Sequence, residues 1–351
     1  MNIAVLLSGG VDSSVALALL KQQGYNVTAF YLKIWLEDEL SFLGNCPWDE
    51  DLSYVRAVCA KENIPLEIVS LQKEYWETIV SYTIAEIKAG RTPNPDMMCN
   101  QRIKFDAFLH VIGPHFDKVA SGHYAQIAMV DGEPILTCSP DAIKDQTYFL
   151  AQMSKTQLSR VLFPIGHLTK VQVRQYAQEF DLPNKDRKDS QGLCFLGKVK
   201  FKDFVKHYIQ EVPGPIIEYE TGTFLGNHTG VWYHTIGQRQ GLGLAGGPWY
   251  VVSKDVMHNT IAVSRNYYTQ DKQRNSFLIN SCNWLVDHVV SRTDLDVKLR
   301  HGAHRYSCTI TPEHNQMRIT INESDQGIAL GQFAVLYDRN RCLGSGVING
   351  Y

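Results

Sequence analysis

A glycine-rich segment near the N-terminus has the composition of a loop that binds an anion. The residues Ser8-Gly9-Gly10-Val11-Asp12-Ser13-Ser14 stand between an apolar run and a helical pattern. In that context glycines let backbone amides approach an anion, and the helix start adds its partial positive charge. Neither the Gly-Lys-Ser/Thr of a Walker loop nor the G-x-G-x-x-G of a dinucleotide fingerprint occurs in this segment. We expect a phosphate group here; the alternative is a glycine turn before an ordinary helix.

A carboxylate and a thiol lie three residues apart in a second segment, residues 91–100. They are Asp96 and Cys99, and they directly precede a predicted helix. Pro93 and Pro95 remove backbone donors and fix φ, which favours a stiff loop over a helix. A cysteine beside a helix N-terminus has its thiolate favoured. Cys99 is therefore a candidate nucleophile with a carboxylate nearby.

A second cysteine, Cys194, lies in a glycine-containing turn with basic surroundings. Residues 185–206 contain seven Lys or Arg and three Asp, a net charge of +4. This charge favours a thiolate and also an RNA backbone, although a solvated helix face would have the same composition. A lone cysteine is usually buried as a small apolar side chain. We expect burial for Cys59, Cys138, Cys282, Cys308 and Cys342.

Strand and helix patterns alternate in the part of the chain that carries these residues. Strands are predicted over 2–7, 25–33, 66–71 and 118–120, and the last one ends at Ser121-Gly122-His123. Helices are predicted over 11–23, 51–63, 75–89, 101–112 and 170–180, the last with Thr169 as its N-cap. This order predicts an α/β fold with a doubly wound parallel sheet.

The remainder of the chain is rich in glycine and β-forming residues. From Pro213 to about Asn266 the pattern predicts a small β-rich domain, and residues 271–275 are a plausible linker. Alternating segments after the linker predict the strands of a small barrel. We expect three domains, over residues 1–200, 201–270 and 271–351, as the length of 351 residues favours.

Composition narrows the class of protein further. The net charge of −2 excludes a generally basic surface, so any RNA binding must come from a local patch. No apolar run reaches the 18 residues of a membrane span, and we expect a cytoplasmic protein without membrane contact. The eight cysteines are scattered and contain no Cys-x-x-Cys pair, which argues against a disulfide framework or a zinc site.

The motifs together are similar to those of the tRNA-specific 2-thiouridylase family. SGGVDSS also resembles the pyrophosphatase-type (PP) loop of enzymes that adenylate a substrate. The other matching segments occur in the family's order across nearly the whole chain. They are RTPNPDMMCNQRIKF, SGHYA, KDQTYFL, LFPIGHLTK, KDSQGLCFLG, YHTIGQRQGLGL and PWYVVSKD.

The resemblance implies a role for each matching position. It makes Cys99 the nucleophile, Cys194 the persulfide carrier and Asp96 the acid/base group. The implied ATP contacts are Leu6, Leu7, Ser8, Gly9, Gly10, Val11, Asp12, Ser13, Leu32 and Gly122, with Asp12 also placed for Mg²⁺. The implied tRNA contacts are Asn94, Pro95, Asp96, His123, Lys144, Asp145, Gln146, Arg305, Tyr306 and Gln332.

The resemblance also implies the fold and the reaction. The fold would be an adenine-nucleotide α hydrolase-like domain, a central β-rich domain and a C-terminal β-barrel, the last two binding tRNA. ATP with Mg²⁺ would adenylate C2 of the wobble uridine, and a persulfide would replace the oxygen with sulfur. A cysteine desulfurase or relay protein would supply that sulfur, and the expected substrates are the Glu, Gln and Lys tRNAs.

Two alternatives share part of this pattern. An amidating ligase has the same loop but needs neither a cysteine pair nor a basic region. An RNA-binding scaffold needs neither an intact loop nor reactive cysteines. The segment over residues 37–51 is long and acidic and differs from the family, so the role of Cys46 and the docking of a sulfur donor stay open.

Overall fold

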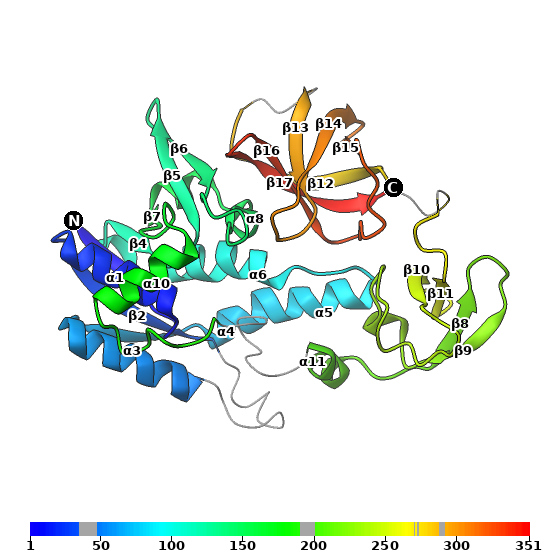
Figure 1. Ribbon diagram of the computed structural model, residues 1–351, viewed down its shortest axis with the longest axis horizontal. Helices are drawn as coiled ribbons and strands as arrows, with labels where there is room; N and C mark the ends of the chain where they lie inside the picture. The colour runs from blue at the N-terminus through cyan, green and yellow to red at the C-terminus, as the bar shows by residue number, and fades with distance from the viewer. Residues whose placement is uncertain (35–47, 190–200, 270, 272–273, 288–291) are drawn as a thin grey trace.

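The computed structural model describes residues 1–34, 48–189, 201–269, 271, 274–287 and 292–351. Figure 1 shows a parallel-sheet part with its helices, a β-barrel above it, and a small separate sheet at the far right. Cys46 and Cys194, and part of the predicted linker, lie outside the described residues. Among the helices that are described, none combines the length and apolar character needed to cross a membrane.

The first part contains a five-stranded parallel sheet with the order β3-β2-β1-β4-β7. The strands are β1 (Asn2–Leu6), β2 (Asn26–Lys33), β3 (Leu66–Ser70), β4 (Lys118–Ala120) and β7 (Val161–Leu162). From β1 the chain adds β2 and β3 on one side and then β4 and β7 on the other side. The loops after β1 and β4 therefore meet at a topological switch point, which is where parallel sheets of this kind bind ligands. The predicted doubly wound sheet is confirmed, although the sequence pattern does not predict the two-residue strand β7.

Helices cover both faces of this sheet, because successive side chains of β1 point to opposite faces and are buried on both. Ile3 and Val5 share a buried cluster with residues of α1 (Val11–Gln22) and α3 (Trp48–Glu62). Ala4 and Leu6 share another with residues that follow Pro95. α10 (Lys170–Glu179) also packs against α1, and Thr169 is its N-cap, as predicted. Thr169 and Gln172 additionally form a capping box, which was not predicted.

Two broken helices run from residue 72 to residue 112. The first consists of α4 (Gln72–Tyr75), a π-helical turn η2 (Trp76–Val80) and α5 (Ser81–Lys88). The second consists of α6 (Pro95–Met98), a π-helical stretch η3 (Cys99–Ala107) and α7 (Phe108–Ile112). The 3₁₀ turn η4 (Gly113–His115) follows α7. The prediction of a loop up to residue 100 is wrong. Proline is tolerated at the first helical position, because its missing N–H would have no intrahelical partner there. Asn94 caps the helix by accepting from the Met97 amide at 3.2 Å.

The C-terminal part is a closed six-stranded barrel, which confirms the predicted architecture. Its order is β12-β15-β14-β13-β16-β17, and β12 pairs again with β17. The strands are β12 (Ser276–Trp284), β13 (Arg292–Lys298), β14 (Tyr306–Glu313), β15 (Gln316–Ile321), β16 (Phe333–Asp338) and β17 (Arg341–Gly350). Inward-facing side chains such as Ile279, Val297 and Ile310 form its core.

Between these parts the chain forms the predicted small β-rich domain. Its sheet has the order β10-β11-β8-β9. The elements here are α11 (Phe201–Tyr208), β8 (Gly214–Glu218), β9 (Phe224–His228), η5 (Val231–Tyr233), β10 (Tyr250–Asp255) and β11 (Thr260–Ser264).

A hairpin that the sequence pattern does not predict joins the first part to the barrel. It consists of β5 (Ala125–Val130) and β6 (Glu133–Cys138), and β6 pairs with the last strand of the barrel through Thr137 and Arg341. The short helices α8 (Thr147–Leu150) and α9 (Lys155–Ser159) follow it. A buried ion pair lies at the same junction, where Lys298 Nζ is 2.7 Å from Asp145 Oδ2 and each side chain is at most 2% exposed.

Candidate active site

The predicted phosphate loop connects β1 to α1 and leaves the start of α1 without a side-chain cap. Gly10 occupies the N-cap position, and Gly9 has a φ of +76°, which favours glycine. Ser13 Oγ and Ser14 Oγ donate to the Gly10 carbonyl at 3.1 and 3.0 Å, which fixes the turn. The first amides of a helix have no intrahelical acceptor, so an uncapped start can receive an anion.

The end of β4 packs directly against this loop. A Cβ atom on Gly122 would lie 2.6 Å from the Ser13 amide nitrogen, so only glycine fits at that position. The switch point therefore brings Gly122 to the phosphate loop, where the sequence predicts an ATP contact. Leu6, Leu7 and Val11 are buried, and Leu32 is partly buried near the end of β2. Their predicted ATP contacts stay predictions.

Asp12 lies at the centre of a charged cluster beside the loop. Its Oδ1 accepts from Lys170 Nζ at 2.7 Å and from the Tyr124 hydroxyl at 2.9 Å. Lys170 Nζ also lies 2.7 Å from Asp189 Oδ1. Burial and then the Asp12 charge raise the pKa of Tyr124, so its hydroxyl stays a donor.

Asp189 pairs with three cations, two from α10 and one from the loop before α8. Lys144 and Arg174 each approach a carboxylate oxygen at 2.7 Å, in addition to Lys170. Burial alone would raise the pKa of Asp189, but the hydrogen bonds from Lys144 and Lys170 outweigh it and lower that pKa overall. Lys170 therefore bridges the carboxylates of Asp12 and Asp189. The sequence motif LFPIGHLTK contains Lys170 but does not by itself reveal its contact with Asp12.

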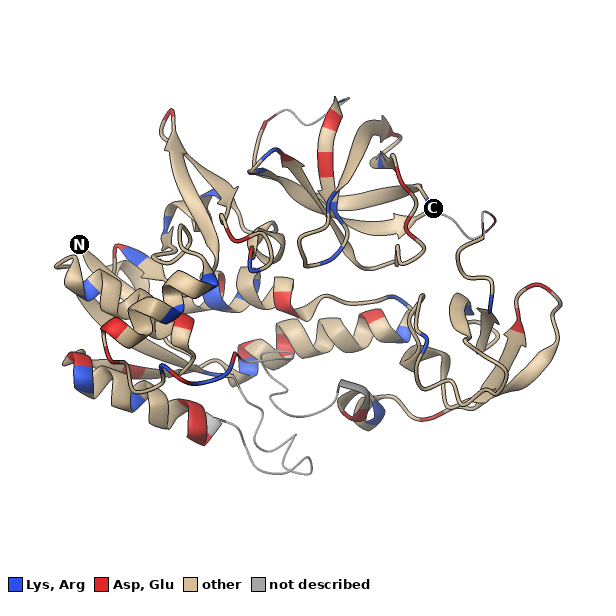
Figure 2. Cartoon of the chain, viewed as in Figure 1, with Lys and Arg blue, Asp and Glu red and all other residues tan. Residues whose placement is uncertain are grey.

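Two further residues support the loop and were not predicted. Asn184 Nδ2 donates to the Gly9 carbonyl at 2.8 Å and to Ser14 Oγ at 2.9 Å. Arg187 pairs with Asp51, which belongs to the acidic first turn of α3 visible in Figure 2. Part of the basic charge predicted for RNA therefore has protein partners, whereas Lys198 and Lys200 lie outside the described residues.

Cys99 does not occupy the polar loop that the sequence suggests. It begins the π-helical stretch η3, is 1% exposed and belongs to an apolar cluster with Met98 and Ile103. Asp96 lies in the preceding turn, where its carbonyl accepts from Asn100 Nδ2 at 3.0 Å. Like Cys99, the other described cysteines form no disulfide, and those predicted to be buried are buried apart from the partly buried Cys282. Cys194 is not described, so the pairing of the two reactive cysteines stays a prediction.

His123 connects this helix with the end of β4. Its Nδ1 is 2.7 Å from Ser121 Oγ, and its ring centroid lies 5.9 Å from that of Phe105 in η3. Burial, with a smaller contribution from the Lys104 charge, holds the pKa of His123 well below its ordinary value. The imidazole is therefore neutral near pH 7. The residue is 8% exposed.

Most residues predicted to contact tRNA have protein partners. Lys144 pairs with Asp189, and Asp145 pairs with Lys298. Gln146 Oε1 accepts from the Tyr124 amide at 3.0 Å. Arg305 stacks 4.4 Å above the Tyr337 ring, and the Tyr306 hydroxyl donates to Asp325 at 2.7 Å. The remaining predicted contacts are Asn94 and Pro95 at the start of α6 and Gln332 in the barrel. These contacts stay predictions.

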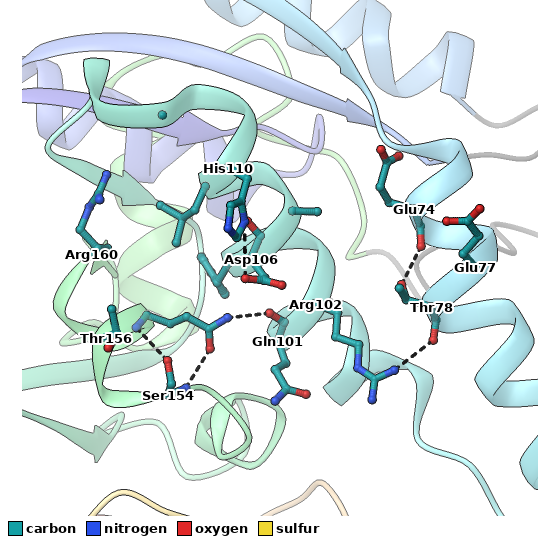
Figure 3. A pocket seen from close by; sticks show the side chains of 15 residues that line it. Glu74, Glu77, Thr78, Gln101, Arg102, Asp106, His110, Ser154, Thr156 and Arg160 are labelled. Atoms are coloured by element: carbon teal, nitrogen blue, oxygen red, sulfur yellow. Dashed lines mark hydrogen bonds and ion pairs between the residues drawn. The ribbon is translucent and has the colours of Figure 1, made fainter.

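A pocket of about 970 Å³ opens on the outer side of η3, away from the phosphate loop (Figure 3). Gln101 and Phe105 line it, whereas none of the predicted ATP contacts does. Its charged lining combines Glu74, Glu77 and Asp106 with Arg102 and Arg160. This mixture offers no basic surface for RNA, so we place the candidate site at the switch point and not in this pocket.

Protein-family models match nearly the whole chain. Three family models match in succession: a tRNA methyl transferase HUP domain over residues 1–198, a tRNA methyl transferase PRC-barrel domain over 202–265, and an aminomethyltransferase beta-barrel domain over 274–348.

Curated relatives match along the whole chain. Identity is 44% over 354 residues with the tRNA-specific 2-thiouridylase MnmA of Parabacteroides distasonis, covering 99% of each chain. It is 46% over 355 residues with tRNA-specific 2-thiouridylase MnmA 1 of Bacteroides thetaiotaomicron, and 43% over 358 residues with the MnmA of Porphyromonas gingivalis, with the same coverage. With a PP-type loop at the switch point and full-length identity of this extent, the chain belongs to the MnmA family of tRNA-specific 2-thiouridylases.

Proposed function

We propose that this protein is a tRNA 2-thiouridylase that uses ATP to adenylate C2 of the wobble uridine and then transfers sulfur from a cysteine persulfide. The observation that carries the ATP half is the uncapped start of α1 beside Gly122 and Asp12, at the switch point of the sheet. The sulfur half rests on Cys99, one helical turn after Asp96, and on the sequence motif around Cys194.

Activation is needed because the oxygen on C2 of uracil is a poor leaving group. Attack of that oxygen on the α-phosphorus of ATP releases pyrophosphate, and the base loses its N3 proton, for which Asp96 is the candidate acceptor. Backbone amides of residues 8–14 and the Lys170 ammonium would stabilise the negative charge of the phosphates. Mg²⁺ would neutralise part of the same charge, and Asp12 is the loop carboxylate that would hold it.

In the sulfur transfer that follows, the persulfide sulfur gains two electrons and the two cysteine thiols lose two. The terminal sulfur of a Cys194 persulfide bonds to C2 and AMP leaves. Cys99 then attacks the Cys194 sulfur, which breaks the sulfur–sulfur bond and frees the thiocarbonyl. Alternatively, Cys99 attacks first and releases hydrosulfide, which displaces AMP. Either route ends in a Cys99–Cys194 disulfide that an external dithiol must reduce.

The donor and substrates follow from this chemistry and from the family. A cysteine desulfurase or a relay protein would load the persulfide, since the described residues include no group that could generate it. The Glu, Gln and Lys tRNAs are the proposed substrates, and the cytoplasm is the proposed compartment, where tRNA, ATP and a thiol reductant occur together.

The proposed function is tested by product formation from defined components. Purified protein, ATP, Mg²⁺, sulfide and an unmodified Glu-tRNA transcript should yield 2-thiouridine at the wobble position, detected by mass spectrometry of nucleosides. A transcript with cytidine at that position is the matched control and should yield none. Release of AMP without tRNA, together with consumption of ammonia, would instead identify an amidating ligase.

Lys170 should matter for adenylation because its ammonium lies within 2.7 Å of Asp12 at the phosphate loop. We expect Lys170→Met to reduce the rate of tRNA-dependent AMP formation by about 100-fold, the typical effect of removing one preorganised donor. Lys61→Met is the matched control, since Lys61 pairs with the exposed Asp181 and lies outside the basic run 185–206. An unchanged rate in Lys170→Met would mean that Lys170 only neutralises Asp12 and Asp189.

A further inference from the structure

The short loop before α6 is held in place by the C-terminal barrel. Figure 1 shows the chain between α5 and α6 passing directly below the barrel. Thr92 N donates to the Leu330 carbonyl at 2.8 Å. Gln332 Nε2 donates to both the Thr92 and Pro93 carbonyls, at 3.1 Å each. The barrel thus binds the backbone of the loop through three hydrogen bonds.

The donors of Gln332 are fully used by this arrangement. A side-chain amide nitrogen carries two N–H groups, and each carbonyl takes one. Gln332 is itself fixed, because its backbone carbonyl accepts from the Ile348 amide and its amide donates to the Ala329 carbonyl. Gln332 Nε2 therefore has no donor left for RNA while the loop is bound.

Backbone packing around the loop is equally close. A Cβ atom on Gly331, where φ is +87°, would lie 2.9 Å from Arg91 Cβ and 3.0 Å from the Thr92 carbonyl oxygen. On the other side, Asn94 Nδ2 lies 3.5 Å from the Tyr148 hydroxyl, which donates to the Phe333 carbonyl of the barrel at 3.1 Å. The N-cap of α6 is thus linked to the barrel from two directions.

The helix that starts at this N-cap carries the reacting groups. Asp96 lies in its first turn and Cys99 directly after it. We propose that Gln332 is a positioning residue: by binding the Thr92 and Pro93 carbonyls it sets the start of α6, and so the placement of Asp96 and Cys99 relative to the phosphate loop. This inference rests on the proposed function, and it assigns Gln332 a different role from the tRNA contact implied by the family resemblance.

The test separates binding of tRNA from the reaction that follows. Gln332→Glu keeps the shape of the side chain but replaces both donors by an oxygen that repels the two carbonyls. We expect the Kd for tRNA to stay within about threefold. The single-turnover rate of AMP formation at saturating tRNA should fall about 100-fold, since displacements of the order of 1 Å cost that much. Within residues 92–98, hydrogen exchange should accelerate at the amides of Thr92, Asn94 and residues 96–98, since the two prolines carry no N–H, and it should stay unchanged in β14 and β15.

Two companion variants complete the design. Gln332→Met removes the donors without adding charge, and it should show the same pattern with a smaller loss of rate; it replaces the first variant if that one does not fold. Gln316→Glu makes the same charge change in β15 and should behave as wild type. A weaker Kd with a normal rate at saturating tRNA would overturn the proposal in favour of a tRNA contact. Unchanged exchange over residues 92–98 would also overturn it, even if wild-type protein formed no AMP and the proposed function itself failed.

Discussion

Replacing Cys99 by serine should reduce 2-thiouridine formation by about 10⁴-fold or more, because a serine hydroxyl can neither attack a persulfide nor close a disulfide. Adenylation precedes sulfur transfer and uses the phosphate loop, so AMP formation should continue. After incubation with a cysteine desulfurase and cysteine, the Cys99→Ser protein should hold a persulfide on the peptide with Cys194. Mass spectrometry of alkylated peptides measures both the persulfide and the absent disulfide.

The complementary variant assigns the two cysteines their separate roles. Cys194→Ser should show no persulfide on that peptide, yet it should still form AMP with tRNA. Cys59→Ser is the matched control, because Cys59 lies in the separate cluster between the sheet and α3, where burial raises its pKa to about 11. A persulfide on Cys99 and none on Cys194 would reverse the assignment. A persulfide on Cys46 would show that the acidic segment over residues 37–51 takes part in sulfur delivery.

Asp12→Asn should lower tRNA-dependent AMP formation by about 1000-fold while tRNA binding persists. The asparagine keeps the shape of the side chain and can still accept from Tyr124, but it loses the charge that holds Lys170 and that would hold Mg²⁺. Radiolabelled ATP with thin-layer separation of AMP measures the rate, and filter binding measures the Kd for tRNA.

A carboxylate elsewhere on the same domain provides the control for this variant. Asp181 pairs with Lys61 and Lys185 on the surface and has a φ of +49°, which asparagine tolerates, so Asp181→Asn should form AMP at the wild-type rate. Equal AMP formation by Asp12→Asn and Asp181→Asn would refute the role of Asp12.

The parts of the site that depend on local sequence were predictable. The strand, the glycine turn and the helix at residues 2–22 follow from an apolar run, from Gly9 and from the helical pattern after Val11, and the structure has each of them. Thr169 as the N-cap of α10 was predictable for the same reason. The ATP contact of Gly122 was implied by the family resemblance and stays a prediction, but Gly122 does pack against Ser13, because the ends of β1 and β4 meet at one edge of the parallel sheet.

The start of α6 shows why other parts were not predictable. Two prolines within three residues favour a loop, but Pro95 occupies the first helical position, where a missing N–H costs nothing. The contacts of Lys170, Asn184 and Asp189 join residues far apart in the chain, so no local pattern reveals them. The pairing of β6 with β17 was not predictable either, because the sequence of a hairpin edge does not indicate which distant strand will pair with it.

That pairing has a consequence for how the protein is made. During synthesis the N-terminal domain leaves the ribosome first, but β17, which pairs with β6 through Arg341 and Thr137, is translated only after the other strands of the barrel. Until then the hairpin presents unpaired backbone groups, and Asp145 lacks the lysine that compensates its charge. The nascent N-terminal domain is thus open to non-native association through this edge until β17 has been synthesised and has paired with β6.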